Sequence, residues 1–138
     1  MRTILSLVFV SFLSFMIVGV NAQTKTDHHA KVAEHHAKAL EHTAALKDGS
    51  GMTKKEMADH AKKAGEHLNK AIEHHAKVTK SAVHKEVANH HVMAKEHHKA
   101  LTKELSNEKP DEAKVKKHAM AMHEELSKAA TKHAASKH

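Results

Sequence analysis

Cysteine, tryptophan and tyrosine are absent from the chain, and proline occurs once in its 138 residues. Without cysteine the chain can form no disulfide, no thiolate metal site and no covalent c-type haem attachment, and it cannot be a lipid-anchored bacterial lipoprotein. All three phenylalanines lie within the first 15 residues, and the sole arginine is Arg2. The rest of the chain therefore has no aromatic ring except imidazole, and we expect no recognition of nucleic-acid bases by stacking.

The sequence also lacks the common signatures of catalysis. It has no cysteine nucleophile, no glycine-rich phosphate loop and no His-Glu-x-x-His zinc motif. The paired Glu-x-x-His repeats of di-iron bundles are missing too, because Glu and His stand here as direct neighbours, which point in different directions on a helix. We therefore expect a protein that is not an enzyme.

The N-terminus has the pattern of an export signal. Arg2 precedes an apolar run over residues 4–20, and Val20-Asn21-Ala22 is a small-residue cleavage site. The run is also near the lower length limit for a membrane span, but its serines and glycine weaken it as an anchor. We expect residues 1–22 to be a signal peptide and residues 23–138 a histidine-rich helical domain that is periplasmic or secreted.

The expected mature domain is basic and poor in large apolar residues. It holds 22 Lys against 16 carboxylates, all 18 His, and only 13 Leu, Ile and Val residues. It also holds 22 Ala and is rich in other strong helix formers. Helices with thin contacts are therefore expected. Contact with an anionic membrane or cell surface through the Lys residues is left open. A homo-oligomer is left open as well.

Breaking residues divide this domain into helices. Asp48-Gly49-Ser50-Gly51 and residues 106–111 are loops, and Thr53 with Glu56 forms a capping-box pattern. The stretch over 53–105 is too long for one ordinary helix, and a break near residues 78–81 would leave four helices of similar length. We predict an all-α, antiparallel four-helix bundle with coiled-coil-like heptads. The alternative is one long central helix with shorter helices packed along it.

Histidines recur with a period of seven. Residues 27–33, 34–40 and 41–47 each begin with Asp or Glu followed by His, and residues 59–75 repeat the pattern. Apolar residues at steps of three and four predict one seam in the first helix and one in the third: Ala30, Ala33, Ala37, Leu40 and Ala44, and Val83, Val87, His90, Ala94, His97, Leu101 and Leu105. One member of each doublet should thus face the interior, namely His90 and His97 in the third helix. His84 should face outward.

This spacing decides where metal sites can form. In the first three helices the histidines of one helix are separated by 1, 6, 7 or 8 residues, never by the three or four that bring side chains together. Seven residues span about 10.5 Å, too far for two ligands of one ion. Ordered sites should therefore lie between helices, one layer to each heptad, and metal binding should be linked to folding.

The fourth helix departs from the doublet pattern. Residues His118, Met120, Met122 and His123 form a mixed imidazole and thioether cluster. Over these six residues the chain resembles the Met/His motifs of periplasmic copper- and silver-binding proteins, and the resemblance implies a preference for soft ions such as Cu(I). The rest of the chain does not follow those families.

Together these patterns predict a transition-metal buffer, store or carrier, with Zn, Cu, Ni or Co bound by imidazole. The predicted ligands are His28, His29, His35, His36, His42, His60, His67, His74, His75, His90, His91, His97, His98, His118, Met120, Met122 and His123. One alternative is a pH-responsive structural or surface-interaction protein. Another is haem binding through bis-His ligation, because the chain shows a loose compositional resemblance to the malarial histidine-rich proteins with their repeated Ala-His-His units.

Overall fold

A computed structural model describes the backbone of residues 4–78 and 82–136, and the side chains of residues 26–78 and 82–136. Over these residues the chain forms four α-helices: α1 (Ile4–Asp48), α2 (Lys54–Ala76), α3 (Ala82–Ser106) and α4 (Glu112–Ala135). The predicted break between the second and third helices is confirmed, since α2 ends at Ala76 and α3 begins at Ala82. Residues 79–81 of that break lie outside the described residues.

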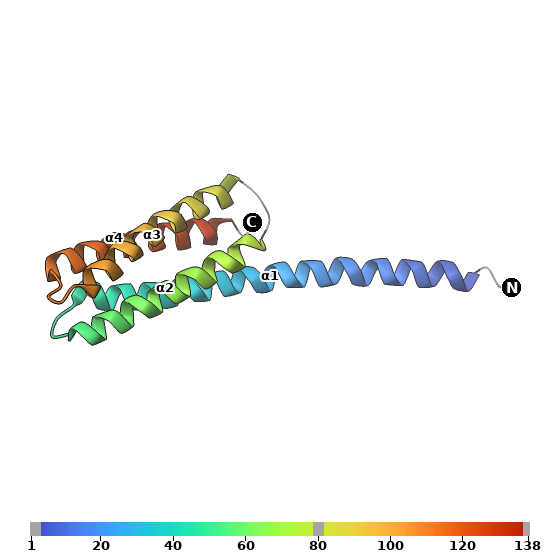
Figure 1. Cartoon of the computed structure of the whole chain (residues 1–138). Helices are drawn as coiled ribbons and strands as arrows, with labels where there is room; N and C mark the ends of the chain where they lie inside the picture. Colours follow the sequence, from blue (N-terminus) through green and yellow to red (C-terminus); the bar gives the residue numbers. More distant parts are fainter. Residues whose placement is uncertain (1–3, 79–81, 137–138) are drawn as a thin grey trace.

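The helices form the predicted all-α bundle (Figure 1). Consecutive helices run antiparallel, α1 packs against α2 and α4, and α3 packs against the same two neighbours. The alternative arrangement around one long central helix is wrong, because the chain turns back between α2 and α3. The loops that follow α1 and α3 lie at one end of the bundle, called here the closed end; the connection between α2 and α3 lies at the other, open end.

The N-terminal part of α1 continues beyond the open end as a single helix (Figure 1). The predicted signal peptide and its cleavage site at Ala22 fall in this part, outside the residues whose side chains are described. Within the side chains described, over 26–78 and 82–136, no helix combines the length and apolarity that crossing a membrane requires.

Local signals set the end of α1 and the starts of α2 and α4 as the sequence predicts, whereas α1 begins at Ile4, well before the start near residue 25 that the sequence suggests. Thr53 caps α2, because its hydroxyl accepts from the backbone N–H of Glu56 while the Glu56 carboxylate accepts from the backbone N–H of Thr53 at 2.8 Å. Asp111 caps α4 by accepting from the backbone N–H of Lys114 at 3.1 Å. Gly49 ends α1 with a φ of 60°, a conformation that only glycine adopts without strain.

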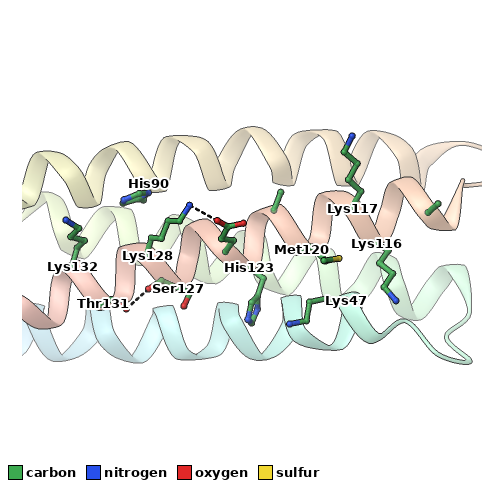
Figure 2. Close-up of a pocket in the computed structure, with 13 residues that line it drawn as sticks. Lys47, His90, Lys116, Lys117, Met120, His123, Ser127, Lys128, Thr131 and Lys132 are labelled. Atoms are coloured by element: carbon green, nitrogen blue, oxygen red, sulfur yellow. Dashed lines mark hydrogen bonds and ion pairs between the residues drawn. The ribbon is translucent and has the colours of Figure 1, made fainter.

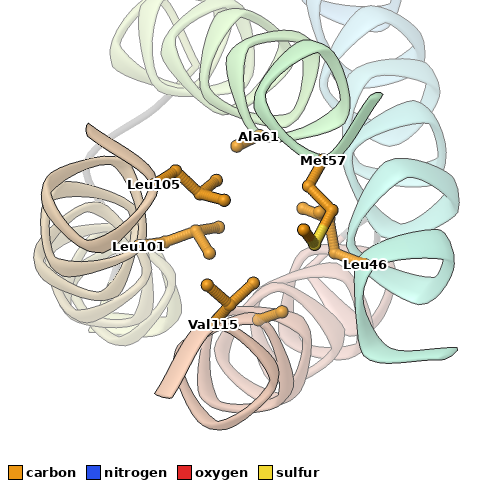
Figure 3. Packing of buried hydrophobic residues seen from close by; sticks show 7 residues of the cluster. Leu46, Met57, Ala61, Leu101, Leu105 and Val115 are labelled. Atoms are coloured by element: carbon orange, nitrogen blue, oxygen red, sulfur yellow. The ribbon is translucent and has the colours of Figure 1, made fainter. Parts of the chain in front are cut away.

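The core changes in character along the bundle axis. A cluster at the closed end contains Leu46, Met57, Ala61, Leu101, Leu105, Val115 and Ala119 (Figure 3). A second cluster further along contains Ala39, Ala64, Leu68, Ala94, Met122 and Leu126. Towards the open end, buried histidines share the interior with a few small apolar residues. The apolar free energy of packing is therefore concentrated at the closed end, and the open end depends on imidazole contacts.

The predicted seam of the first helix is wrong. Ala30, Ala33 and Ala37 are exposed, and the buried line of α1 is Val32, His36, Ala39, Thr43 and Leu46. This line keeps the steps of four and three but lies on another side of the helix. Larger side chains remove more apolar area from water than alanine does, so Val32 and Leu46 turn inward in preference to the alanines.

Gly65 lets α3 approach α2 closely. A Cβ at this position would overlap the imidazole ring of His98, whose Nε2–H donates to the carbonyl oxygen of Ala61 at 3.0 Å. The glycine is therefore a packing requirement at a position where alanine would otherwise be the better helix former.

We expect Gly65→Ala to lower the free energy of unfolding by about 1 kcal/mol, because the His98 ring must move. In a His98→Ala background the same substitution should raise it by about 0.5–1 kcal/mol through helix propensity. Urea denaturation of the four proteins measures both changes. Equal effects in the two backgrounds would show that the His98 ring does not press on Gly65.

Candidate functional site

Three pairs of histidines join α1 to α2 along the interface between the two helices. Each pair places two Nδ1 atoms in contact: His28 and His74 at 3.1 Å, His35 and His67 at 3.2 Å, and His42 and His60 at 3.1 Å. The pairs arise from the heptads, because the helices are antiparallel and each step of seven along α1 is met by a step of seven back along α2. These histidine contacts therefore lie between helices, where the sequence predicts that any ordered metal site would form.

The three pairs form one continuous column. The rings of neighbouring pairs stack, with centroids 5.5 Å apart for His35 and His74 and 5.9 Å apart for His42 and His67. We call these six residues the histidine ladder: His28, His35, His42, His60, His67 and His74. Every ladder histidine is half-buried, so its ring is held by packing while one edge of the column remains open to solvent.

The surroundings of the ladder favour the neutral form of four of its rings. Partial burial, reinforced by neighbouring histidines and lysines, lowers the pKa of His35, His42 and His74 from the usual 6.5, and burial with nearby lysines lowers that of His67. Two of the adjacent carboxylates pair with lysines of their own helix, Glu34 with Lys38 at 2.6 Å and Glu73 with Lys77 at 2.9 Å. Near pH 7 each pair therefore has nitrogen lone pairs available as ligands.

A second group of histidines lies inside the bundle, nearer its open end. It takes one residue from each helix, and we call it the four-histidine layer: His36, His75, His91 and His133. All four are buried, with exposed fractions of 1%, 7%, 2% and 1%. Each stands three, four or seven residues from an apolar core position of its own helix, so the packing that buries the alanines and leucines also buries these rings.

The rings of the layer contact one another in a closed circuit. Centroid separations are 5.0 Å for His36 and His91, 5.3 Å for His91 and His75, 6.0 Å for His75 and His133, and 5.9 Å for His133 and His36. The two Nε2 atoms of His36 and His91 lie 2.7 Å apart. Burial lowers the pKa of His36 and of His75 to about 4 and that of His91 to about 3, with neighbouring histidines as the second cause.

Two further histidines extend the layer towards the open end. The ring of His29 lies 4.9 Å from that of His133 and 6.0 Å from that of His84, and the His84 ring stacks on His75 at 5.1 Å. The expectation that His84 faces outward is therefore wrong. It stands seven residues before His91, and a strict heptad reading places both on one face of α3.

In α3 the histidine of a doublet that is buried is not the one that the sequence predicts. His91, not His90, is fully buried, and His90 instead contacts the Glu125 carboxylate of α4 at 2.7 Å between Nδ1 and Oε2. His97 and His118 make a looser contact between α3 and α4, with centroids 6.3 Å apart. The predicted seam of α3 is otherwise buried at Val87, Ala94, Leu101 and Leu105, but His91 takes the place of His90 among them.

The Met/His cluster of α4 is spread around the helix. His118 faces His97 on α3, and the Nδ1 atom of His123 contacts the Thr43 hydroxyl of α1 at 2.9 Å. Met122 is buried in the second core cluster, whereas Met120 is 49% exposed. The structure does not bring the four side chains together, because steps of two residues point to opposite sides of a helix.

A groove of about 1010 Å³ runs beside α4 (Figure 2). It is lined by Lys47, Lys116, Lys117, Lys128 and Lys132, with His90, His123 and Met120 among the other residues. Lys128 pairs with Glu124 at 2.7 Å and Lys132 with Glu86 at 2.6 Å. The ladder and the layer lie outside this groove.

The predicted ligands include all six residues of the ladder and three of the four residues of the layer, but not His84 or His133. His133 could have been found, because it follows the core residue Leu126 by seven. Among the described residues, no three or more His, Asp or Glu side chains are arranged as they would be around a metal ion. In comparisons with known proteins, no family model, no curated protein and no solved structure matches the chain.

Proposed function

We propose that the protein binds divalent transition-metal ions at the pairs of the histidine ladder and acts as an exported metal buffer or carrier. One observation carries the proposal: at three places along the α1–α2 interface, two imidazole nitrogens from different helices lie 3.1–3.2 Å apart. With bonds of about 2.0–2.1 Å, two nitrogen ligands of one ion are about 2.9 Å apart at 90° and about 3.4 Å apart at the tetrahedral angle. The observed separations fall between these limits.

The ladder favours ions that imidazole binds well. Zn(II), Cu(II), Ni(II) and Co(II) all accept neutral imidazole, and intrinsic affinity is highest for Cu(II). Each pair supplies two ligands, and water at the solvent-exposed edge of the ladder can supply the remaining ligands. Sites with two protein ligands release their ion more readily than closed sites with four. Several such sites in one small chain suit buffering or transfer better than permanent storage.

The pair geometry favours an ion over haem. Bis-His ligation requires two imidazoles on opposite faces of a porphyrin, with a flat space between them. The paired nitrogens of the ladder are already in contact. The chain after residue 15 also contains no Phe, Tyr or Trp to pack against a porphyrin.

Calorimetric titration of the purified protein with Zn(II), Cu(II) and Ni(II) tests the proposal. We expect several equivalents to bind at pH 7.5. The triple variant His60→Gln, His67→Gln and His74→Gln removes one member of every pair and should lose up to three of them.

A matched control is the triple variant His97→Gln, His118→Gln and His123→Gln, which leaves every ladder pair intact. It should retain the ladder equivalents. Equal losses in the two triple variants, or full binding by the ladder variant, would show that the pairs are not the sites.

A further inference from the structure

The four-histidine layer is an unusual way to fill a bundle interior. An apolar side chain at each of these positions would avoid the cost of removing imidazole nitrogens from water, which is largest for a nitrogen left without a partner. The chain instead places His36, His75, His91 and His133 together, one from each helix, with no more than 7% of any of them exposed.

The hydrogen bonds of the layer leave part of this cost uncompensated. His36 and His91 share one short contact through their Nε2 atoms, and His133 contacts His29 at 3.0 Å. Nδ1 of His36 and Nε2 of His75 are buried with no hydrogen-bond partner. Buried polar atoms are rarely left in this state, and an ion bound within the layer would satisfy one nitrogen of each ring.

We propose that the four-histidine layer is a second, internal metal site that takes one Zn(II) ion through four imidazoles. The inference deepens the proposed function and rests on it, because it adds a closed site to the open pairs of the ladder. Four nitrogens contributed from four directions suit a tetrahedral ion, whereas Cu(II) and Ni(II) prefer square-planar or tetragonal surroundings. The ladder pairs, with water as further ligands, are the better sites for those two ions.

Four of the six ring separations within the layer approach those of a tetrahedral site. Around a tetrahedral ion bonded at about 2.0–2.1 Å, the centroids of four imidazoles lie about 5 Å apart. The four separations around the layer are 5.0–6.0 Å. Binding requires the rings to turn so that one nitrogen of each faces the centre, and the 2.7 Å contact between His36 and His91 must widen by about 0.6 Å.

Access to the layer is provided at the open end. His29 and His84 contact each other and reach His133 and His75 of the layer, respectively. They are half-buried, whereas the layer is buried. An ion can therefore pass from one imidazole to the next without crossing an apolar barrier. The low pKa values of His36, His75 and His91 keep their lone pairs free near pH 7.

Co(II) is the probe that separates the two classes of site, because a tetrahedral Co(II) ion absorbs visible light much more strongly than one surrounded by waters. We expect wild type to develop this absorption to one equivalent and to lose it when Zn(II) is added. The ladder variant His60→Gln, His67→Gln, His74→Gln should keep it. His91→Leu and His133→Leu should each lose it while keeping the ladder equivalents.

Unchanged cobalt absorption in both leucine variants would overturn the internal site. Loss of metal by the leucine variants with no loss in the ladder variant would overturn the ladder function and leave the internal site standing. Circular dichroism establishes that the variants are helical. If they are not, imidazole ¹⁵N spectra of the wild type with one equivalent of Zn(II) decide the matter: shifts at the four layer rings support the site, and their absence overturns it.

Discussion

Acidification from pH 7.5 to pH 5 is expected to remove at least about 4 kcal/mol from the free energy of unfolding of the metal-free protein. The principal contributors are His36 and His91, whose pKa values are lowered from 6.5 to about 4 and about 3 by burial. In the unfolded chain these rings take up a proton near pH 6.5, whereas in the bundle they do so only near pH 3–4. At pH 5 each therefore favours the unfolded state by about 2 kcal/mol.

The direction follows from the lowered pKa values. The stability that neutral His36 and His91 preserve is fully present above pH 6.5 and is lost as the pH falls towards 4. The groups that face this pair from the other helices are His75 and His133, and the lowered pKa of His75 adds a loss in the same sense. The free energy of unfolding of a whole domain is about 5–15 kcal/mol, and the core of this domain is thin. We expect its helical circular dichroism to collapse between pH 6 and 4.5.

The double variant His36→Leu, His91→Leu provides the control. Leucine has no proton to take up, so this variant should keep its helicity to a lower pH and exceed wild type in stability by several kcal/mol at pH 5. Urea denaturation at pH 7.5 and pH 5 measures the difference. A wild-type protein with equal stability at both pH values would contradict the assignment of buried neutral imidazoles.

Saturation with Zn(II) at pH 7.5 is expected to raise the melting temperature by about 10–20 °C. An ion that binds only the folded chain at a hundred times its Kd stabilises by about 2.7 kcal/mol for each site. Each kcal/mol corresponds to about 4 °C for a domain of this size. The melting-temperature shift summed over the three ladder pairs and the layer is larger than this range. The unfolded chain also binds ions through its many histidines, which reduces the shift.

Differential scanning calorimetry with and without a chelator measures this shift. Mg(II) serves as the ionic control, because it prefers oxygen ligands and should leave the melting temperature unchanged. The ladder variant should show a smaller Zn(II) shift than the variant at His97, His118 and His123. A melting temperature that is insensitive to saturating Zn(II) would separate metal binding from folding and contradict the link between them.

Much of the fold could be predicted because its signals are local. The capping box at Thr53, the glycine at position 49 and the loop before Asp111 act through hydrogen bonds and backbone angles within a few residues. The contact of histidines between helices could be predicted for a similar reason. A spacing of seven excludes chelation on a single helix whatever surrounds it, and it brings every ladder residue to the same side of its helix.

The partners of individual histidines could not be predicted in the same way. Alanine occurs on several sides of α1 and is small enough to be buried or exposed at little cost, so Ala30, Ala33 and Ala37 looked as suitable for the interior as Val32 or Ala39. The rotation of each helix about its own axis depends on how four helices fit together. In α3 either member of the doublet keeps steps of three and four between Val87 and Ala94, so the sequence alone does not decide that His91 rather than His90 is buried.

The sequence by itself determined the number of helices, the loops that separate α1 from α2 and α3 from α4, and the heptad step of the histidines, which excludes chelation within any of the first three helices. Only the tertiary structure decided that the ladder pairs His28 with His74 and that His133 completes a layer with His36, His75 and His91. The reason is physical: helix ends and periods depend on neighbours along the chain, whereas register and rotation depend on the packing of all four helices at once.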